Sequence, residues 1–202
     1  MAFDTNVPGW MTEYELGFLG EWATLVPVNG TVVEIGSFMG RSSVAWAMSC
    51  DPSVKIYCGD IFYEHFTQNH PFSLEEAPYA PISGHEYNTW VEFQKNTEKF
   101  KNIIPMRGTA PLESNYNQDP IDLLFVDAAH SNPSDWDTIK YFAQFVKVGG
   151  FITGHDHSEH YPDVVENAKR LSAMYGSPLK IIEFTMLWSV EVTKPYSAED
   201  FI

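Results

Sequence analysis

The chain has 202 residues, of which 44% are apolar and 15% aromatic, so it is long enough to form a single domain over residues 1–202 with a substantial core. Its 27 acidic side chains outnumber 12 basic ones, and the formal net charge of −15 disfavours nucleic acid and anionic membranes as partners, because both are negatively charged. The first basic residue is Arg41, whereas secretory and mitochondrial leaders carry early positive charge. No apolar run approaches the ~18 residues of a membrane span, so we expect a cytoplasmic protein without a leader.

The first predicted element is a helix over residues 12–26. Thr12 and Glu15 have the spacing of a capping box, in which each side chain accepts a hydrogen bond from the backbone N–H of the other residue. Leu16, Leu19 and Trp22 then recur on one face, as in an amphipathic helix that packs against a core.

Beyond this helix, short β-branched and apolar runs alternate with amphipathic segments. The runs that predict strands are 31–36, 54–60, 102–108, 121–127, 150–156 and 182–192. The segments that predict helices are 41–49, 86–100, a stretch from Asn132 that the Gly149–Gly150 pair stops, and a stretch from Pro162 that Gly176 ends. This alternation is typical of an α/β, Rossmann-like doubly wound fold with a mainly parallel sheet and helices on both faces.

Residues 61–85 interrupt this alternation. They show no periodicity and contain three prolines, so we expect a loop inserted over the core. Its aromatic side chains either line a ligand site, for which the loop would be a lid, or pack as ordinary core residues. The aromatic residues concerned are Phe62, Tyr63, Phe66, Phe72 and Tyr79.

The segment VVEIGSFMGRSS at 32–43 has the order strand, glycine-rich turn, helix start. Gly36 and Gly40 let the backbone approach a ligand closely, and the amides near Arg41 and Ser42 at the helix start suit an anion. Their G-x-x-x-G spacing differs from the G-x-G-x-x-G of NAD sites. Asp60, at the end of the next strand, can accept hydrogen bonds from a ribose diol. Together these features predict a nucleoside-containing cofactor, although each alone also fits a structural turn and a solvated aspartate.

Four of the predicted strands carry a carboxylate at or near their ends, namely Glu34, Asp60, Asp127 and Asp156. In parallel sheets ligands bind beyond the carboxyl ends of the strands. Acids that converge on one crevice are costly unless they meet donors or cations. Their distribution therefore predicts a functional site.

At these motifs the chain resembles the class I S-adenosylmethionine-dependent methyltransferases, above all their branch of small, often metal-dependent O-methyltransferases acting on catechols, sugars or macrolide glycosides. The resemblance runs from about Met11 to Val192. Its motifs are VVEIGSFMGRSS (32–43), CGD (58–60), RGTAPL (107–112), LLFVDAAH (123–130) and VGGFITGHDHS (148–158). It implies a seven-stranded sheet with an antiparallel C-terminal strand, so residues 182–192 would divide into two antiparallel strands.

The resemblance also implies S-adenosylmethionine as the cofactor and indicates where it binds. The residues expected around its methionine part are Glu34, Gly36, Ser37 and Gly40, and Ser42 at the helix start is also expected to bind the cofactor. Asp60 would hold the ribose, Gly108 and Thr109 would border the adenine, and Asp127 would lie between cofactor and acceptor. Arg41 would either receive the cofactor's carboxylate or pair with a neighbouring acid.

A divalent cation is a further implication of the resemblance. In the metal-dependent relatives, an aspartate at the position of Asp127 and an acidic pair in the place of Asp156 and His157 bind magnesium. Magnesium prefers oxygen ligands, whereas imidazole suits zinc, iron or nickel. The histidine therefore leaves three alternatives: a different metal, a His157 that only shapes the pocket, or no metal.

Two further histidines lie near the predicted strand ends. His130 follows Asp127 by three residues, where some sugar O-methyltransferases place their general base; alternatively, it only hydrogen-bonds the next helix start. His155 alternates with His157 along a strand, so the two could ligate a metal from one face, or His155 could be a hydrogen-bonded partner at the sheet end.

The sequence thus predicts a methyltransferase that methylates a hydroxyl of a small molecule, such as a sugar or another polyhydroxylated compound, with His130 as base and Asp127 and Asp156 orienting the acceptor. The alternatives are an NAD-dependent oxidoreductase, a non-catalytic protein that binds a nucleoside cofactor, and a zinc or iron hydrolase built on residues 155–157. A homo-oligomer is compatible with each of these predictions.

Overall fold

A seven-stranded sheet forms the centre of the computed structural model, which describes residues 6–66, 86–111 and 115–201. The strands are β1 (Thr31–Ile35), β2 (Lys55–Asp60), β3 (Ile103–Arg107), β4 (Ile121–Val126), β5 (Val146–Gly154), β6 (Lys180–Ile181) and β7 (Trp188–Glu191). Their order is β3-β2-β1-β4-β5-β7-β6. β1 to β5 pair in parallel, and β7 is antiparallel to β5 and β6. The predicted fold class is confirmed.

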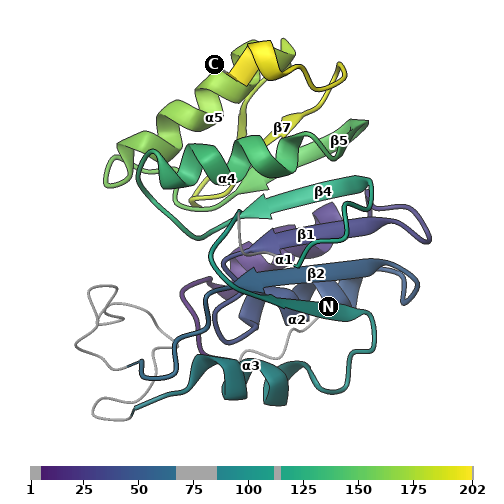
Figure 1. The fold of residues 1–202 in the computed structure, drawn as a ribbon, viewed down its shortest axis with the longest axis vertical. Helices are drawn as coiled ribbons and strands as arrows, with labels where there is room; N and C mark the ends of the chain where they lie inside the picture. Colours follow the sequence, from purple (N-terminus) through teal and green to yellow (C-terminus); the bar gives the residue numbers. More distant parts are fainter. Residues whose placement is uncertain (1–5, 67–85, 112–114, 202) are drawn as a thin grey trace.

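Helices cover both faces of this sheet (Figure 1). They are α1 (Glu13–Ala23), α2 (Arg41–Ser49), α3 (Thr89–Thr97), α4 (Ser134–Ala143), α5 (Pro162–Tyr175) and the short 3-10 helix η1 (Ala198–Phe201). Val33 and Ile35 of β1 pack towards α4 and α5, whereas Val32 packs towards α1 and α2. Successive strand residues point to opposite faces, so the continuously apolar strands follow from burial on both sides. No helix in the described ranges combines the length and hydropathy of a membrane-spanning segment.

The N-terminal helix starts as predicted and ends three residues early. Thr12 accepts a hydrogen bond from the amide of Glu15 at 3.2 Å, and Glu15 accepts one from the amide of Thr12 at 2.9 Å, which completes the capping box. Leu16 and Leu19 are fully buried. This capping box also fixes the position of Glu15, which takes part in the site described below.

The Gly149–Gly150 pair does not stop a helix, which corrects the prediction. α4 ends at Ala143, and the pair lies within β5. Gly149 has φ +85°, and a side-chain carbon at Gly150 would lie 2.8 Å from the carbonyl oxygen of Asp122. The pairing of β4 with β5 shifts register in this region, so the glycines serve an irregular strand.

β6 and β7 form a hairpin, so only the last part of the predicted strand 182–192 is a strand. The turn falls at 182–187, where Phe184 has φ +63° and is 93% exposed. The Thr185 hydroxyl donates to the carbonyl of Ile182 at 2.8 Å and accepts from the amide of Leu187 at 3.0 Å. The Thr185 side chain therefore stabilises the turn. Because this threonine lies within the alternating apolar pattern, the turn is not evident from the sequence. An antiparallel C-terminal strand pair is present as the resemblance implies, but the expected division within 182–192 is wrong, because β6 at Lys180–Ile181 precedes this range.

Candidate active site

The glycine turn between β1 and α2 lies directly against the end of β4. Gly36 has φ +101°, and a side-chain carbon there would lie 1.8 Å from the carbonyl oxygen of Asp127. The amide of Asp127 donates to the carbonyl of Ile35 at 2.8 Å. Only glycine permits both the backbone conformation and this close approach, so Gly36 brings the predicted cofactor turn and Asp127 together.

Glu34 lies behind the turn and does not face the crevice, contrary to the expectation that the four strand-end acids converge there. Its side chain is fully buried between β1 and α2. It accepts hydrogen bonds from the hydroxyl of Ser43 and from the indole of Trp46. Burial raises the pKa of Glu34, although hydroxyls including those of Ser42 and Ser37 oppose the shift. These groups stabilise the turn from inside.

Asp60 stands at the end of β2 as predicted. Its two carboxylate oxygens accept the amides of Phe38 at 2.8 Å and Phe62 at 2.7 Å. The amide of Gly108 donates to the backbone carbonyl of Asp60 at 3.0 Å, and exposed Thr109 follows. Burial raises the pKa of Asp60, whereas the amide bonds favour the carboxylate. The structure thus brings Asp60, Gly108 and Thr109 together.

Arg41 binds backbone carbonyls of the N-terminal segment. Its side chain is buried, and the guanidinium donates to the carbonyl oxygens of Met11 at 2.7 Å and Val7 at 2.8 Å. Gly9 packs against the same side chain. Arg41 therefore ties residues 7–11 to the start of α2, next to Gly40, which caps this helix with φ +92°.

Asp127, His130 and Asp156 form a cluster beyond the ends of β4 and β5. Their potential ligand atoms lie within 4.8 Å of one another. His130 Nε2 is 2.9 Å from Asp156 Oδ2, and the ring of His130 packs on that of Tyr161 with centroids 4.4 Å apart. Asp156 has φ +62°, which is uncommon for a residue other than glycine. This backbone conformation sets the direction of its carboxylate beyond the end of β5. His157 is not part of this cluster, although the sequence placed it beside Asp156 as a ligand.

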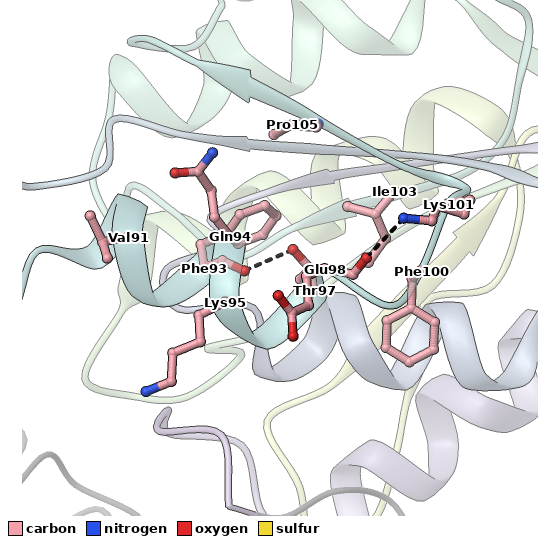
Figure 2. A pocket seen from close by; sticks show the side chains of 10 residues that line it. All are labelled: Val91, Phe93, Gln94, Lys95, Thr97, Glu98, Phe100, Lys101, Ile103 and Pro105. Carbon is pink, nitrogen blue, oxygen red and sulfur yellow. Dashed lines mark hydrogen bonds between the residues drawn. The ribbon is translucent and has the colours of Figure 1, made fainter.

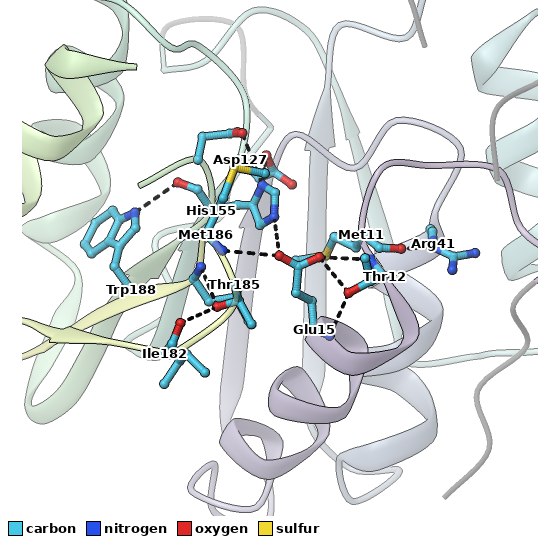
Figure 3. A network of polar contacts seen from close by, with 12 residues as sticks. Met11, Thr12, Glu15, Arg41, Asp127, His155, Ile182, Thr185, Met186 and Trp188 are labelled. Atoms are coloured by element: carbon cyan, nitrogen blue, oxygen red, sulfur yellow. Dashed lines mark hydrogen bonds and ion pairs between the residues drawn. The ribbon is translucent and has the colours of Figure 1, made fainter. Parts of the chain in front are cut away.

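His155 is the buried centre of a second set of contacts, shown in Figure 3. Its Nε2 is 3.1 Å from Glu15 Oε1, and its Nδ1 is 3.3 Å from Asp156 Oδ1 and 3.8 Å from Asp127 Oδ1. Glu15 also accepts the amide of Met186 at 3.3 Å. Glu15 is not among the site residues predicted from the sequence, because a capping-box glutamate carries no signal that distinguishes it from a purely local cap.

The charges in these two sets of contacts shift several pKa values. Burial opposes the ionisation of Asp156, but hydrogen bonds from His130 and His155 outweigh it and lower its pKa. Burial raises the pKa of Asp127, with His155 acting in the opposite direction. Burial would lower the pKa of His130, but contact with Asp156 and the charge of Asp127 raise it. The cluster therefore combines an ionised carboxylate, Asp156, with a histidine whose basicity that carboxylate raises.

Glu15→Gln is expected to remove an acid-sensitive contribution to stability. Burial opposes ionisation of Glu15, but its contacts with His155 and two amides lower the pKa from the ordinary 4.5 to about 2. Because the folded pKa is the lower one, this contribution is present above pH 4.5 and is lost as the pH falls through about 2. The shift corresponds to about 3 kcal/mol.

Urea unfolding from neutral pH down to about pH 2 measures this effect. The free energies of unfolding of wild type and variant should differ most above pH 4.5 and converge towards pH 2. Exposed Glu13, on the same helical turn, provides the control Glu13→Gln, for which we expect a small difference. A Glu15→Gln difference that did not change with pH would contradict the assignment.

The hollow shown in Figure 2 lies elsewhere, on the outer edge of the sheet. It has a volume of about 580 Å³ and is lined by residues of α3, of the loop that follows α3 and of β3. Its polar groups bond locally: the Thr97 hydroxyl donates to the carbonyl of Phe93 at 2.7 Å. None of the predicted site residues lines it.

The comparisons with known proteins agree with this geometry. A family model described as a methyltransferase domain matches residues 33–157, from β1 through the cluster of Asp127, His130 and Asp156. The chain belongs to this methyltransferase family. Family membership makes S-adenosylmethionine the expected cofactor and removes the support for an oxidoreductase or a metal hydrolase. No curated protein matches the sequence.

Several solved structures share the fold of this methyltransferase at low sequence identity. A protein described as a caffeoyl-CoA O-methyltransferase from Staphylococcus aureus is 12% identical with a TM-score of 0.65, covering 95% of this chain and 88% of that one. The O-methyltransferase NovP is 16% identical with a TM-score of 0.62, covering 91% and 81%. An rRNA methylase from Streptococcus thermophilus is 14% identical with a TM-score of 0.58, covering 90% and 96%. The fold alone therefore leaves the acceptor open.

The strand ends of this methyltransferase fit S-adenosylmethionine. The Asp60 carboxylate accepts the amides of Phe38, Phe62 and Ile61 and retains acceptor capacity for a ribose diol. Asp156, beyond the end of β5, is the ionised carboxylate of the cluster and would attract the cofactor's sulfonium cation. Residues 67–85 and 112–114, which include most of the predicted lid, lie outside the described ranges; Phe62 and Phe66 at its start are buried.

Proposed function

We propose that this methyltransferase transfers the methyl group of S-adenosylmethionine to a hydroxyl of a small molecule, such as a sugar or another polyhydroxylated compound. The observation that carries the proposal is the contact of 2.9 Å between His130 and Asp156, beside the glycine turn and at the carboxyl ends of β4 and β5. A neutral hydroxyl is a weak nucleophile until its proton is removed, so O-methylation calls for a base at this position.

His130 can act as this base through Nδ1. When its Nε2–H donates to Asp156, the neutral ring has its lone pair on Nδ1, which accepts the hydroxyl proton. The ring packing of Tyr161 restricts the orientation of the imidazole. Asp156 then stabilises the imidazolium that forms, and Asp127, which is partly exposed, can accept a hydrogen bond from the substrate.

The cofactor, when bound, supplies an activated methyl group, so the remaining task of the chain is alignment. The transfer is an in-line displacement, and correct placement of the two reactants supplies a large part of the acceleration. Asp60 and the Gly36 turn fix one reactant, and the cluster around His130 fixes the other. The net charge of −15 favours an uncharged or cationic small acceptor over RNA.

A screen for product formation tests the proposal. Wild type and His130→Ala are incubated with S-adenosylmethionine and a panel of sugars, glycosides, catechols and short RNA, and S-adenosylhomocysteine is measured. Transfer to a hydroxylated small molecule that requires His130 supports the proposal. Transfer to RNA or to carbon or nitrogen atoms only, or transfer that does not need His130, refutes it.

Asp60→Asn is expected to weaken cofactor binding by about 10- to 100-fold, because hydrogen bonds to a charged group contribute about 1.5–3 kcal/mol. Isothermal titration with S-adenosylhomocysteine measures the dissociation constant. Asp51→Asn is the matched control, since Asp51 is exposed and its carboxylate accepts hydrogen bonds from nearby Ser53. Equal affinities of Asp60→Asn and Asp51→Asn would contradict the role of Asp60.

A further inference from the structure

We propose that His155 is a built-in cation that positions Asp156 and Asp127 and takes the place of a divalent metal ion, so that this methyltransferase uses none. The inference rests on the proposed function, because it concerns the carboxylates that orient His130 and the acceptor. It makes His155 a positioning residue, since its ring contacts the carboxylates and is itself buried away from the crevice.

The hydrogen-bond geometry of His155 requires a donor on both sides of its ring. Nε2 faces Glu15 Oε1 at 3.1 Å, and Nδ1 faces Asp156 Oδ1 at 3.3 Å. A neutral imidazole has only one N–H, so one of these carboxylates would then meet a lone pair. An imidazolium donates to both carboxylates.

The surroundings hold this ring in place. The backbone amide of His155 donates to the carbonyl of Val126 at 3.2 Å, and the indole of Trp188 donates to the His155 carbonyl at 3.1 Å. Glu15 is fixed in turn, because Thr12 donates to its second oxygen through both amide and hydroxyl. Figure 3 shows Glu15 reaching from α1 towards His155 and Met186. Contacts within the fold therefore fix the position of the His155 imidazolium.

Asp127, His130 and Asp156 carry donor atoms of the kind that ligate a metal ion, but both oxygens of Asp156 already have histidine partners. One of its oxygens is engaged by His130 and the other by His155, so a metal ion would have to displace a histidine contact. An imidazolium nitrogen also lies 3.8 Å from Asp127 Oδ1, where its charge repels a second cation. Burial of the ionised Asp156 requires compensating positive charge, and His155 contributes to it together with His130.

Metal binding by the full-length chain tests this inference without any acceptor. Chelator-treated protein is titrated with MnCl₂, and bound manganese is measured by electron paramagnetic resonance. We expect no stoichiometric binding at micromolar manganese by wild type or by the control His157→Gln, whose histidine lies outside the cluster. The double variant Glu15→Gln/His155→Gln keeps a neutral pair in the buried position and removes the cation, so we expect it to gain manganese affinity at least tenfold.

Each outcome decides the inference. Stoichiometric manganese binding by wild type would overturn it, and so would equal, weak binding by wild type and a double variant whose circular dichroism shows that it is folded. If the double variant does not fold, His155→Asn with Glu15 retained provides the second comparison. Once an acceptor is known, the double variant should lose kcat while KM for S-adenosylmethionine changes little. A failure of His130 as base would leave the manganese result unchanged, so the two proposals fail separately.

Discussion

His130→Ala is expected to lower the turnover number by about 10²- to 10⁴-fold, the usual contribution of a positioned general base. The affinity for S-adenosylhomocysteine should change little, because His130 lies with Asp156 and Tyr161, whereas the ribose is expected at Asp60. Initial rates of S-adenosylhomocysteine formation and isothermal titration measure the two quantities. A loss of turnover without a loss of affinity distinguishes removal of the base from general damage to the protein.

His160→Ala is the control for this substitution. His160 is an exposed histidine four residues beyond Asp156 and carries no proposed role. It should retain wild-type turnover. If His130→Ala also retained wild-type turnover, the base assignment would be refuted, and if it lost cofactor affinity in parallel with turnover, His130 would instead be a binding residue.

The fold was predictable because its signals are local. Apolar runs of strand length, glycine turns and the capping box at Thr12 each depend on neighbouring residues, and the structure confirms them. The C-terminal hairpin was harder, because Thr185 makes its turn within an alternating apolar pattern. The Gly149–Gly150 pair was misread because glycines that end a helix and glycines in an irregular strand look alike in sequence.

The candidate site was predictable only where strand ends determine it. Asp60 is the last residue of β2, Asp127 directly follows β4 and Asp156 comes two residues after β5, so parallel pairing brings them to one edge. Glu34 comes one residue before its strand ends, and the side-chain alternation of the strand buries it against α2. The contact between Glu15 and His155 joins residues 140 positions apart, so no local pattern could indicate it.

Gly36→Ala is expected to destabilise the protein by more than about 3 kcal/mol and to abolish cofactor binding. A residue with a side chain at φ +101° is strained by about 1–3 kcal/mol. The added carbon would also lie 1.8 Å from the carbonyl oxygen of Asp127, which is backbone and cannot rotate away. Relief of this clash must separate β1 from the end of β4, and with it the cofactor turn from Asp127.

Gly149→Ala separates the cost of backbone strain from the cost of the steric clash. Gly149 also has positive φ, at +85°, but a side-chain carbon there meets nothing within 4 Å. It should therefore cost only the backbone strain, about 1–2 kcal/mol, and leave S-adenosylhomocysteine affinity unchanged. Urea unfolding and isothermal titration of both variants measure the difference. Equal losses in stability would mean that the approach of Gly36 to Asp127 contributes nothing, whereas a larger loss at Gly36, accompanied by lost affinity, assigns this contact to the assembly of the site.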